Sequence, residues 1–414
     1  MTGYIAGMSS SLPSLPIRLI DDGRGTFGPL TDLRPVYALR AGLGTIVERI
    51  EAKVGSKVVA VDVPAAVRDI AQEELQTSAH GATASTEQLV VNARLLSLDV
   101  LDGLHAGEAR YADDGAFLAA RVPTGTAPAA AQPGAATFKA QLANAPWDIT
   151  TRIATTLAED IELFRNAPVL ANCERRALRP DEGQSFGTHP ILIDRTATVG
   201  PLCVIDASKG PVVIGAGVVV RPFAVLVGPC AILDGSTVAE RSLIKASTVI
   251  GPHCRAGGEI GGTIFQAYSN KSHDGHLGDS FVGEWVNIGA GSDNSNLLNT
   301  YGEVIVRLEA DGGLTRTGRQ FWGAVIGDHV KLAIGTRLMT GTTIGTGAMI
   351  ACSRSPATLV PRFSWLTDSA DGPKSFRIDK FLETARAMMS RRGKSPTPAV
   401  EAAIRALHAK ATGA

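Results

Sequence analysis

Residues 214–250 read IGAGVVVRPFAVLVGPCAILDGSTVAERSLIKASTVI, and an aliphatic side chain recurs at every sixth position. The residue four places after each is small or β-branched. A helix repeats its buried face every 3.6 residues and a strand every 2, so neither explains this spacing. A period of six indicates the hexapeptide repeat of a left-handed parallel β-helix, in which three hexads make one triangular coil and the aliphatic residue points inward. The aliphatic positions are Ile214, Val220, Leu226, Ile232, Val238, Ile244 and Ile250.

The repeat predicts a β-helix domain over about 187–356, with two interruptions. The pattern falters after Ile250, recovers at Val282 and Ile288, breaks over 292–320 and resumes at Ile326. At Arg354 a charged side chain takes a position that should be small, so we expect the prism to end there. A regular prism needs no polar clusters, and we therefore expect functional residues in the interruptions.

The flanking regions predict two further kinds of structure. Residues 1–125 alternate strand and helix patterns, which favours a small Rossmann-like α/β domain with a parallel sheet. Residues 126–186 read as a linker and helical connector, and 357–414 as a helical tail. The expected strands are 16–20, 57–62 and 88–96, and the expected helices are 36–53, 65–75, 146–166, 376–391 and 398–409.

Composition narrows the class of protein. The 40 basic and 40 acidic residues balance, so no basic face for nucleic acid or a membrane surface is expected. The five cysteines show no CxxC spacing, which favours buried thiols over disulfides or a zinc site. The N-terminus lacks a signal-peptide pattern, and no apolar run reaches the roughly 18–20 residues that span a bilayer. We expect a cytoplasmic protein.

The first interruption contains QAYSNKSHDGHLGD at 266–279, and the second is preceded by VNIGAG at 286–291. His273 and His276 lie three residues apart, and a histidine can act as a base near neutral pH. Two other interpretations stay open. These polar residues can be solvated corners of the prism, or His273, His276 and Asp279 can hold zinc, as in a β-helix of the γ-carbonic-anhydrase type.

At these residues the chain resembles a known family. The run HDGHLGDSFVGEWVNIGAG, together with YSNKSHDGHLGDS, NSNLLNTYGEV and TGRQFWGAVIGDHVK, is similar to the bifunctional N-acetylglucosamine-1-phosphate uridylyltransferase/glucosamine-1-phosphate N-acetyltransferases. The match is nearer to a shorter bacterial variant of that family, and DDGRGTFGPLTDLRPVYALRAG resembles its N-terminus. The resemblance implies a homotrimer that uses acetyl-CoA and an amino-sugar phosphate, with UTP or another nucleoside triphosphate and Mg²⁺ if the N-terminal domain is active.

The resemblance also implies roles for individual residues. His273 takes the place of the catalytic base, which removes a proton from the sugar amine as the nitrogen attacks the thioester. Ala290 presents backbone to the thioester, and Ala333 and Ala351 fall where the pantetheine groove lies. The expected contacts to the sugar phosphate come from Arg255, Lys271, His276, Asn287 and Asn296.

The N-terminal motif matches less fully. Gly23-Arg24-Gly25-Thr26 imitates a phosphate-binding loop, and Arg34 stands nearby as a second candidate cation. Phe27 replaces the family's arginine, and the expected lysine is missing. Asp21 and Asp22 are candidate Mg²⁺ ligands. An acetyltransferase with a non-catalytic N-terminal domain, and a non-catalytic or zinc-binding β-helix, therefore stay open as alternatives to the bifunctional enzyme.

Overall fold

The computed structural model describes residues 14–78, 85–130, 132–134, 138–139, 141–370 and 372–413. The chain forms two compact units that interleave in sequence. Unit 1 comprises 1–24, 35–38 and 46–143, and unit 2 comprises 25–34, 39–45 and 144–414. Two short segments of the predicted N-terminal domain therefore belong to the unit that contains the repeats.

Unit 1 is built on one six-stranded sheet with the order β2-β1-β3-β5-β4-β6. β1 runs parallel to both β2 and β3, and β5 is antiparallel to β3 and β4. The sheet is mixed rather than purely parallel, and Ile17 and Leu19 of β1 are completely buried in it. Its elements are β1 (Ile17–Ile20), α1 (Ile46–Val54), β2 (Val58–Asp62), α2 (Arg68–Ser78), β3 (Glu87–Asn92), β4 (Glu108–Tyr111), β5 (Phe117–Pro123) and β6 (Gln132–Pro133).

The predicted helix over 36–53 is only half right. A 3-10 turn occupies 36–38, the chain is not helical over 39–45, and α1 begins at Ile46. The reason is tertiary. A Cβ on Gly42 would lie 2.3 Å from the Asp160 carboxylate, and the Leu43 amide donates to that carboxylate at 2.8 Å. This close approach overrides the local helical pattern.

The connector predicted as one helix over 146–166 is two helices. Thr151 donates its hydroxyl to the Trp147 carbonyl at 2.7 Å at the junction, where the first helix stops. The connector helices are α3 (Pro146–Thr150), α4 (Ile153–Leu163) and α5 (Pro168–Ala171).

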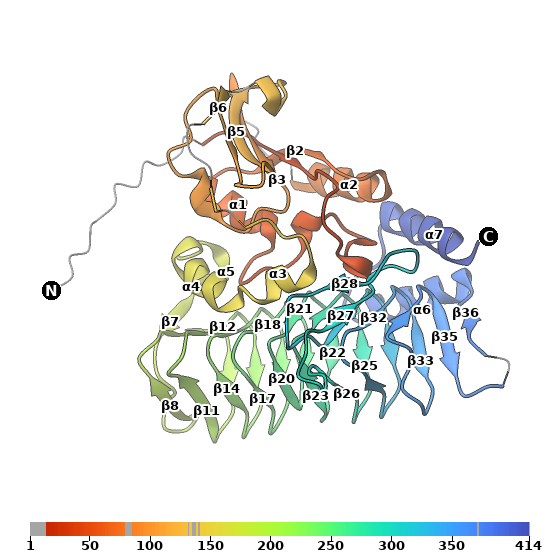
Figure 1. The fold of residues 1–414 in the computed structure, drawn as a ribbon. Helices are drawn as coiled ribbons and strands as arrows, with labels where there is room; N and C mark the ends of the chain where they lie inside the picture. Colours follow the sequence, from red (N-terminus) through yellow and green to blue (C-terminus); the bar gives the residue numbers. More distant parts are fainter. Residues whose placement is uncertain are drawn as a thin grey trace. The chain divides into compact units, whose positions relative to one another are not determined.

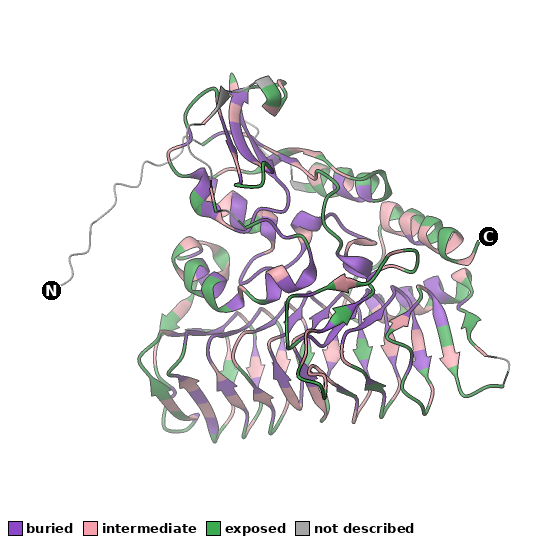
Figure 2. Ribbon diagram, in the orientation of Figure 1, coloured by how far each residue is buried: buried purple, intermediate pink, exposed green. Residues whose placement is uncertain are grey.

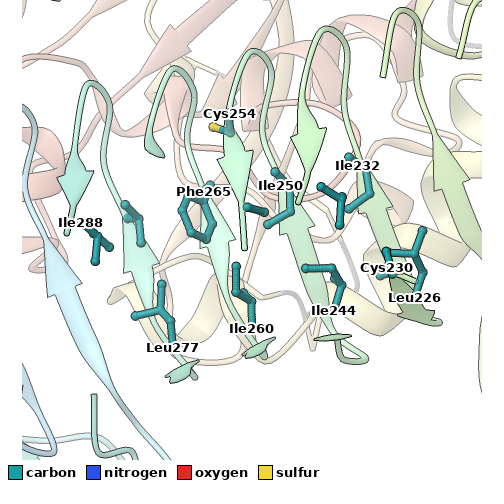
Figure 3. Close-up of a cluster of buried hydrophobic side chains, with 14 of the residues drawn as sticks. Leu226, Cys230, Ile232, Ile244, Ile250, Cys254, Ile260, Phe265, Leu277 and Ile288 are labelled. Atoms are coloured by element: carbon teal, nitrogen blue, oxygen red, sulfur yellow. The ribbon is translucent and has the colours of Figure 1, made fainter. Parts of the chain in front are cut away.

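Unit 2 is a parallel β-helix with C-terminal helices, as predicted (Figure 1). Ile214 pairs with Ile232, and Ile232 with Ile250, so one coil takes 18 residues, or three hexads. Every predicted inward aliphatic residue of 214–250 is at most 1% exposed. Full burial of one such side chain is worth about 1.5–3 kcal/mol, so the interior column is the main stabilising feature (Figures 2 and 3).

Three sheets form the faces of the prism, and each coil contributes one strand to each face where the repeat is regular. The first face contains β7 (Cys173–Arg175), β9 (Ile191–Asp194), β12 (Val212–Ile214), β15 (Cys230–Ile232), β18 (Thr248–Ile250), β21 (Ile264–Phe265), β24 (Phe281–Val282), β29 (Ala324–Ile326), β32 (Thr342–Ile344) and β34 (Leu359–Val360). The second face contains β8 (Gly183–Gly187), β11 (Cys203–Ala207), β14 (Val225–Val227), β17 (Leu243–Ile244), β20 (Glu259–Gly261) and β23 (His276–Gly278). The third face contains β10 (Thr198–Val199), β13 (Val219–Val220), β16 (Thr237–Val238), β19 (Arg255–Ala256), β22 (Asn270–Lys271), β25 (Asn287–Ile288), β30 (Lys331–Leu332), β33 (Met349–Ala351), β35 (Ser364–Thr367) and β36 (Lys374–Ser375).

The interruptions of the repeat are coils of irregular length. Ile250 pairs with Phe265 and Phe265 with Val282, so these two coils are shorter than 18 residues. Val282 then pairs with Ile326, because an excursion containing the hairpin β27 (Ile305–Val306) and β28 (Thr315–Arg316) leaves the prism and returns. β26 (Asp293–Asn294) pairs with β31 (Arg337–Leu338) across this coil.

The parallel ladder continues past Arg354, where the sequence predicted its end. β34 and β35 pair with β32 and β33 after a shorter coil. α6 (Ile378–Ser390) and α7 (Pro398–Thr412) follow, close to their predicted bounds. They pack through Phe381, Leu382 and Ile404 onto Phe363. Across the described ranges, no helix is long and apolar enough to cross a membrane.

Candidate functional site

A pocket of about 640 Å³ lies between the third face of the β-helix and α6. The register of the face places Arg255, Asn270, Asn287 and Lys331 side by side on four neighbouring strands. All four line the pocket, together with His273 from the turn after β22. Three of the residues that the resemblance implied for acetyl transfer, Arg255, His273 and Asn287, therefore share one pocket.

Lys271 does not line this pocket. Its side chain is 1% exposed, and its Nζ donates to the carbonyls of Gly257, His273 and Asp274 at 3.0, 2.9 and 3.2 Å. Burial lowers its pKa to about 8. The pleat explains the difference, because Asn270 points outward and its neighbour must point inward. With its three N–H groups used, Lys271 holds the His273 turn in place, and we leave it out of the proposed phosphate site.

His276 and Asn296 lie apart from the pocket lining. His276 sits on β23 of the second face, beside Glu259, and its Nδ1 is 3.1 Å from the Asn294 carbonyl. Asn296 donates to Asp279 at 2.6 Å, and a Cβ on Gly278 would lie 2.7 Å from both Asn296 Nδ2 and His276 Cε1. The HxxH spacing thus divides between two faces, because the turn after β22 is a corner of the prism.

The zinc interpretation requires His273, His276 and Asp279 to lie close together. His273 lines the pocket on the third face, whereas His276 and Asp279 belong to the second face and the corner after it. Throughout the described ranges, no group of three His, Cys, Asp or Glu side chains is placed to hold a metal ion.

Positive charge dominates the pocket. Arg255, Lys331, Arg391 and Arg392 line it, and none of the described residues that line it is an Asp or Glu. Burial, and then the charges of Arg255 and Arg391, lower the pKa of Arg392. Lys331 donates from Nζ to the carbonyls of two corner residues at 2.8 and 2.9 Å, and burial lowers its pKa to about 7. Such a pocket favours an anionic ligand.

One corner of the prism forms a rigid wall of stacked rings. His253, Tyr268, Trp285 and His329 each have φ between 54° and 58° and occupy the same corner of successive coils. Their ring centroids are 4.9, 4.3 and 6.4 Å apart in that order, and Tyr268 and Trp285 line the pocket. Burial lowers the pKa of His329 well below its usual value and keeps it neutral. The hexad pattern could have revealed this column, since each ring follows an inward apolar residue by three places.

The three alanines implied for the coenzyme lie next to the pocket strands without lining the pocket. Ala333 and Ala351 directly follow the paired residues Leu332 and Ile350, and the Ala333 amide donates to the Ile350 carbonyl at 2.8 Å. Ala290 accepts from the Gly335 amide at 2.8 Å.

Unit 1 has its own pocket, of about 560 Å³, where β1 and β2 end. Asp21, Asp22, Gly23, Asp62 and Arg68 are among the residues that line it. Burial raises the pKa of Asp21. Burial would also raise the pKa of Asp22, but hydrogen bonds from Arg94, the Arg24 amide and Asn92 leave this pKa lowered. Carboxylates at this edge suit a divalent cation better than a bare phosphate.

The predicted phosphate loop divides between the two units. Gly23 and Arg24 belong to unit 1, where only Gly23 lines the pocket. Gly25 and Thr26 belong to unit 2, and the Thr26 amide donates to the Asn144 carbonyl at 2.7 Å. Arg34 is also part of unit 2.

The Arg34 guanidinium is already bound to carboxylates. Its Nη2 lies 2.9 Å from Asp328 and 3.3 Å from Glu284, and its side chain is 8% exposed. The structure therefore shows Arg34 in a buried ion pair, and its contact with phosphate stays a prediction.

Comparison with known proteins agrees with the sequence motifs. Residues 17–167 match the sugar nucleotidyl transferase family model. The bifunctional GlmU proteins of Methanococcus vannielii and Methanococcus aeolicus are 32% and 31% identical over 127 and 165 residues. Those matches cover 31% and 39% of this chain, and 28% and 39% of the relatives' own lengths.

A third relative is a bifunctional sugar-1-phosphate nucleotidylyltransferase/acetyltransferase from Sulfurisphaera tokodaii, 34% identical over 22% of each chain. The match to a solved UDP-N-acetylglucosamine acyltransferase from Francisella novicida covers 51% of this chain and 73% of that protein, at 15% identity and with a TM-score of 0.23. The predicted resemblance is thus confirmed by the family model and the sequence relatives: the chain is similar to the GlmU-type sugar nucleotidyltransferase/acetyltransferases.

Proposed function

We propose that unit 2 uses this pocket to transfer an acetyl group from acetyl-CoA to the amine of a phosphate-bearing amino sugar, similar to glucosamine-1-phosphate. The observation that carries the proposal is the meeting of His273, Arg255 and Asn287 in one cationic pocket. The resemblance assigns these residue types to a base, a phosphate ligand and a sugar ligand, and the pocket supplies each at a single place.

In this reaction the neutral sugar nitrogen attacks the thioester carbonyl carbon. His273 accepts the proton that the nitrogen loses, and the carbon–sulfur bond breaks to release the coenzyme as a thiol once its sulfur is protonated. Arg255 holds the phosphate with a forked guanidinium, a geometry suited to phosphate oxygens. Asn287 donates to the sugar. Ala290, Ala333 and Ala351 would border the coenzyme, and we expect the active assembly to be a homotrimer.

The direct test replaces His273 by Ala. General-base catalysis contributes about 10²–10⁴-fold, so acetyl transfer to glucosamine-1-phosphate should fall by that factor. Raising the pH should partly restore the rate, because the amine then loses its proton without help. His189→Ala, at an exposed histidine outside the pocket, is the matched control.

Two results would count against the assignment. Unchanged turnover in the His273 variant would remove the base from this pocket. An equal loss in His276→Ala, with His273→Ala fully active, would move the reaction to the second face. Circular dichroism of each variant separates lost chemistry from lost folding.

We further propose that unit 1 transfers a nucleotidyl group from UTP, or another nucleoside triphosphate, to the sugar phosphate with Mg²⁺. The match of residues 17–167 to the nucleotidyl transferase model and the pair Asp21 and Asp22 at the strand ends support this second activity. Mg²⁺ would be held by these carboxylates and would shield the triphosphate charge. Pyrophosphate release in wild type and in Asp22→Asn tests it, and no release from the wild type would leave unit 1 a binding domain only.

A further inference from the structure

α6 presents one face to the pocket and another to the protein core. Thr384, Ala387, Met388 and Arg391 line the pocket, and their spacing of three and four residues marks a single helical stripe. Phe381, Leu382, Ala385 and Met389 are buried on the neighbouring stripe. Because the core fixes the rotation of the helix, Arg391 is directed at the pocket and Arg392 continues from the helix end.

Three guanidinium groups, those of Arg255, Arg391 and Arg392, line this pocket. Arg392 donates from Nη2 to Asn270 Oδ1 at 3.4 Å, and Asn270 is the register neighbour of Arg255. In the part of the chain that the structure describes, no Asp or Glu forms an ion pair with Arg255, Arg391 or Arg392. By contrast, Arg94 and Arg362 form ion pairs with Asp22 and Asp32.

Several cations in one pocket attract an anion. A phosphate monoester presents the oxygens of one phosphorus atom, and the forked guanidinium of Arg255 can bind two of them. The two α6 arginines add two further guanidinium groups to the same pocket, and these can bind the oxygens of a second phosphate group. The pocket volume of about 640 Å³ leaves room for a ligand larger than a sugar monophosphate.

We propose that Arg391 and Arg392 of α6, facing Arg255 across the pocket, form a diphosphate subsite, and that the ligand of unit 2 is an amino sugar carried on a nucleoside diphosphate. The choice of acceptor rests on the proposed acetyl transfer, whereas the diphosphate subsite stands without it. Each arginine can bind phosphate oxygens through two parallel N–H groups, and α6 thereby makes the site selective for the longer anion.

Isothermal titration with two simple probes tests the subsite on the full chain. Inorganic phosphate and inorganic pyrophosphate are titrated at equal ionic strength, with a chelator present so that the carboxylates of unit 1 hold no divalent ion. We expect pyrophosphate to bind wild type at least ~10-fold more tightly than phosphate, with a bidentate charge-assisted pair accounting for the difference.

The variants assign that preference to α6. Arg391→Gln/Arg392→Gln should lower the ratio of the two affinities to about 3 or less, and Arg392→Gln alone serves if the double variant does not fold. Lys394→Gln removes a neighbouring exposed charge outside the pocket and should keep the ratio. Arg255→Gln should weaken both probes, which locates the binding in this pocket.

Equal wild-type affinities for the two probes, or an unchanged ratio in the α6 variants, would overturn the subsite. Acetylation assays separate this result from failure of the proposed function. Full acetylation of a sugar monophosphate by the double variant, with no preference for the nucleotide-linked acceptor in wild type, would also overturn the inference while leaving acetyl transfer intact. A retained pyrophosphate preference without any acetyl transfer would support the subsite and remove the proposed reaction.

Discussion

Replacing Arg34 by Gln separates the two roles that this arginine has been given. The resemblance makes it a candidate phosphate contact, whereas the structure buries it in unit 2. Its Nη1 donates to Asp328 Oδ1 at 2.9 Å, and its Nη2 lies 2.9 Å from Asp328 Oδ2 and 3.3 Å from Glu284. The Asp328 side chain is 2% exposed and that of Glu284 is 27% exposed.

The magnitude follows from what the substitution leaves behind. Removing one partner of a buried ion pair costs about 3–5 kcal/mol, because the remaining charge stays desolvated. We expect the lower part of this range, since Asp328 still accepts from the Glu284 amide at 2.7 Å and Glu284 is partly exposed. At roughly 2–4 °C per kcal/mol for a large domain, the unfolding midpoint of unit 2 should fall by on the order of 10 °C.

Thermal and urea unfolding followed by circular dichroism measure this loss. The matched control is Arg221→Gln, whose 3.8 Å pair with Glu240 is more than half exposed on both sides and should cost about 0–1 kcal/mol. Burial raises the pKa of Glu284, and Arg34 opposes that rise. Without Arg34 the native pKa rises further, so the folded variant binds protons that the unfolded chain releases. The deficit should therefore shrink as the pH falls from 8 to 5.

One outcome would refute this reasoning. If Arg34→Gln unfolds at the wild-type midpoint at every pH but loses turnover with UTP, the arginine contacts phosphate and the ion pair is energetically unimportant. Loss of both stability and turnover, with turnover restored at low temperature where the variant is folded, supports the structural role.

Three further predictions concern the β-helix. Ile244→Ala should lower the free energy of unfolding by about 2–5 kcal/mol, because it leaves a cavity in the core. Leu202→Ala, at a corner residue that is 64% exposed, should change this free energy little. Equal effects of the two substitutions in chemical denaturation would contradict the inward register of Ile244. Burial lowers the pKa of Lys331 from 10.5 to about 7. Between these two pH values the unfolded chain holds a proton on Lys331 that the folded protein has lost. The stability of the wild type should therefore rise with pH across this window, relative to that of Lys331→Met. Parallel pH profiles of the two melting temperatures would show that the amine stays charged. Burial raises the pKa of Cys230 and Cys254 to about 12 each, so both thiols should resist alkylation at pH 8 until the protein unfolds, and rapid labelling of either by mass spectrometry would contradict their burial.

The repeat was predictable because the rule that sets it is local. An aliphatic side chain must point inward once per hexad, and Ile214, Ile232 and Ile250 stack as the period requires. The same regularity identified the interruptions, and His273 and Asn287 near them do line the pocket. Asn270, Tyr268 and Trp285 were missed as lining residues, although the strand register and the corner positions would have pointed to them.

Other features needed contacts that lie far apart in sequence. Whether Lys271 and His276 join His273 depends on which side of a pleat or corner each occupies, and motif spacing does not contain that information. The partners of the phosphate-like loop and of Arg34 also lie far along the chain, because the Thr26 amide bonds to Asn144 and Arg34 pairs with Asp328.

The sequence by itself determined the parallel β-helix, its coil length and the region of the polar site, because period and side-chain size act within one coil. Only the tertiary structure decided what closes the pocket. Arg392 meets Asn270 from 122 residues away because α6 buries Phe381 and Leu382 against the end of the prism, and this packing turns its arginines toward the third face. The apolar stripe of α6 is not part of the hexad pattern, yet its burial brings the arginines to the pocket. Their positive charge is the charge that a ligand of this pocket must match.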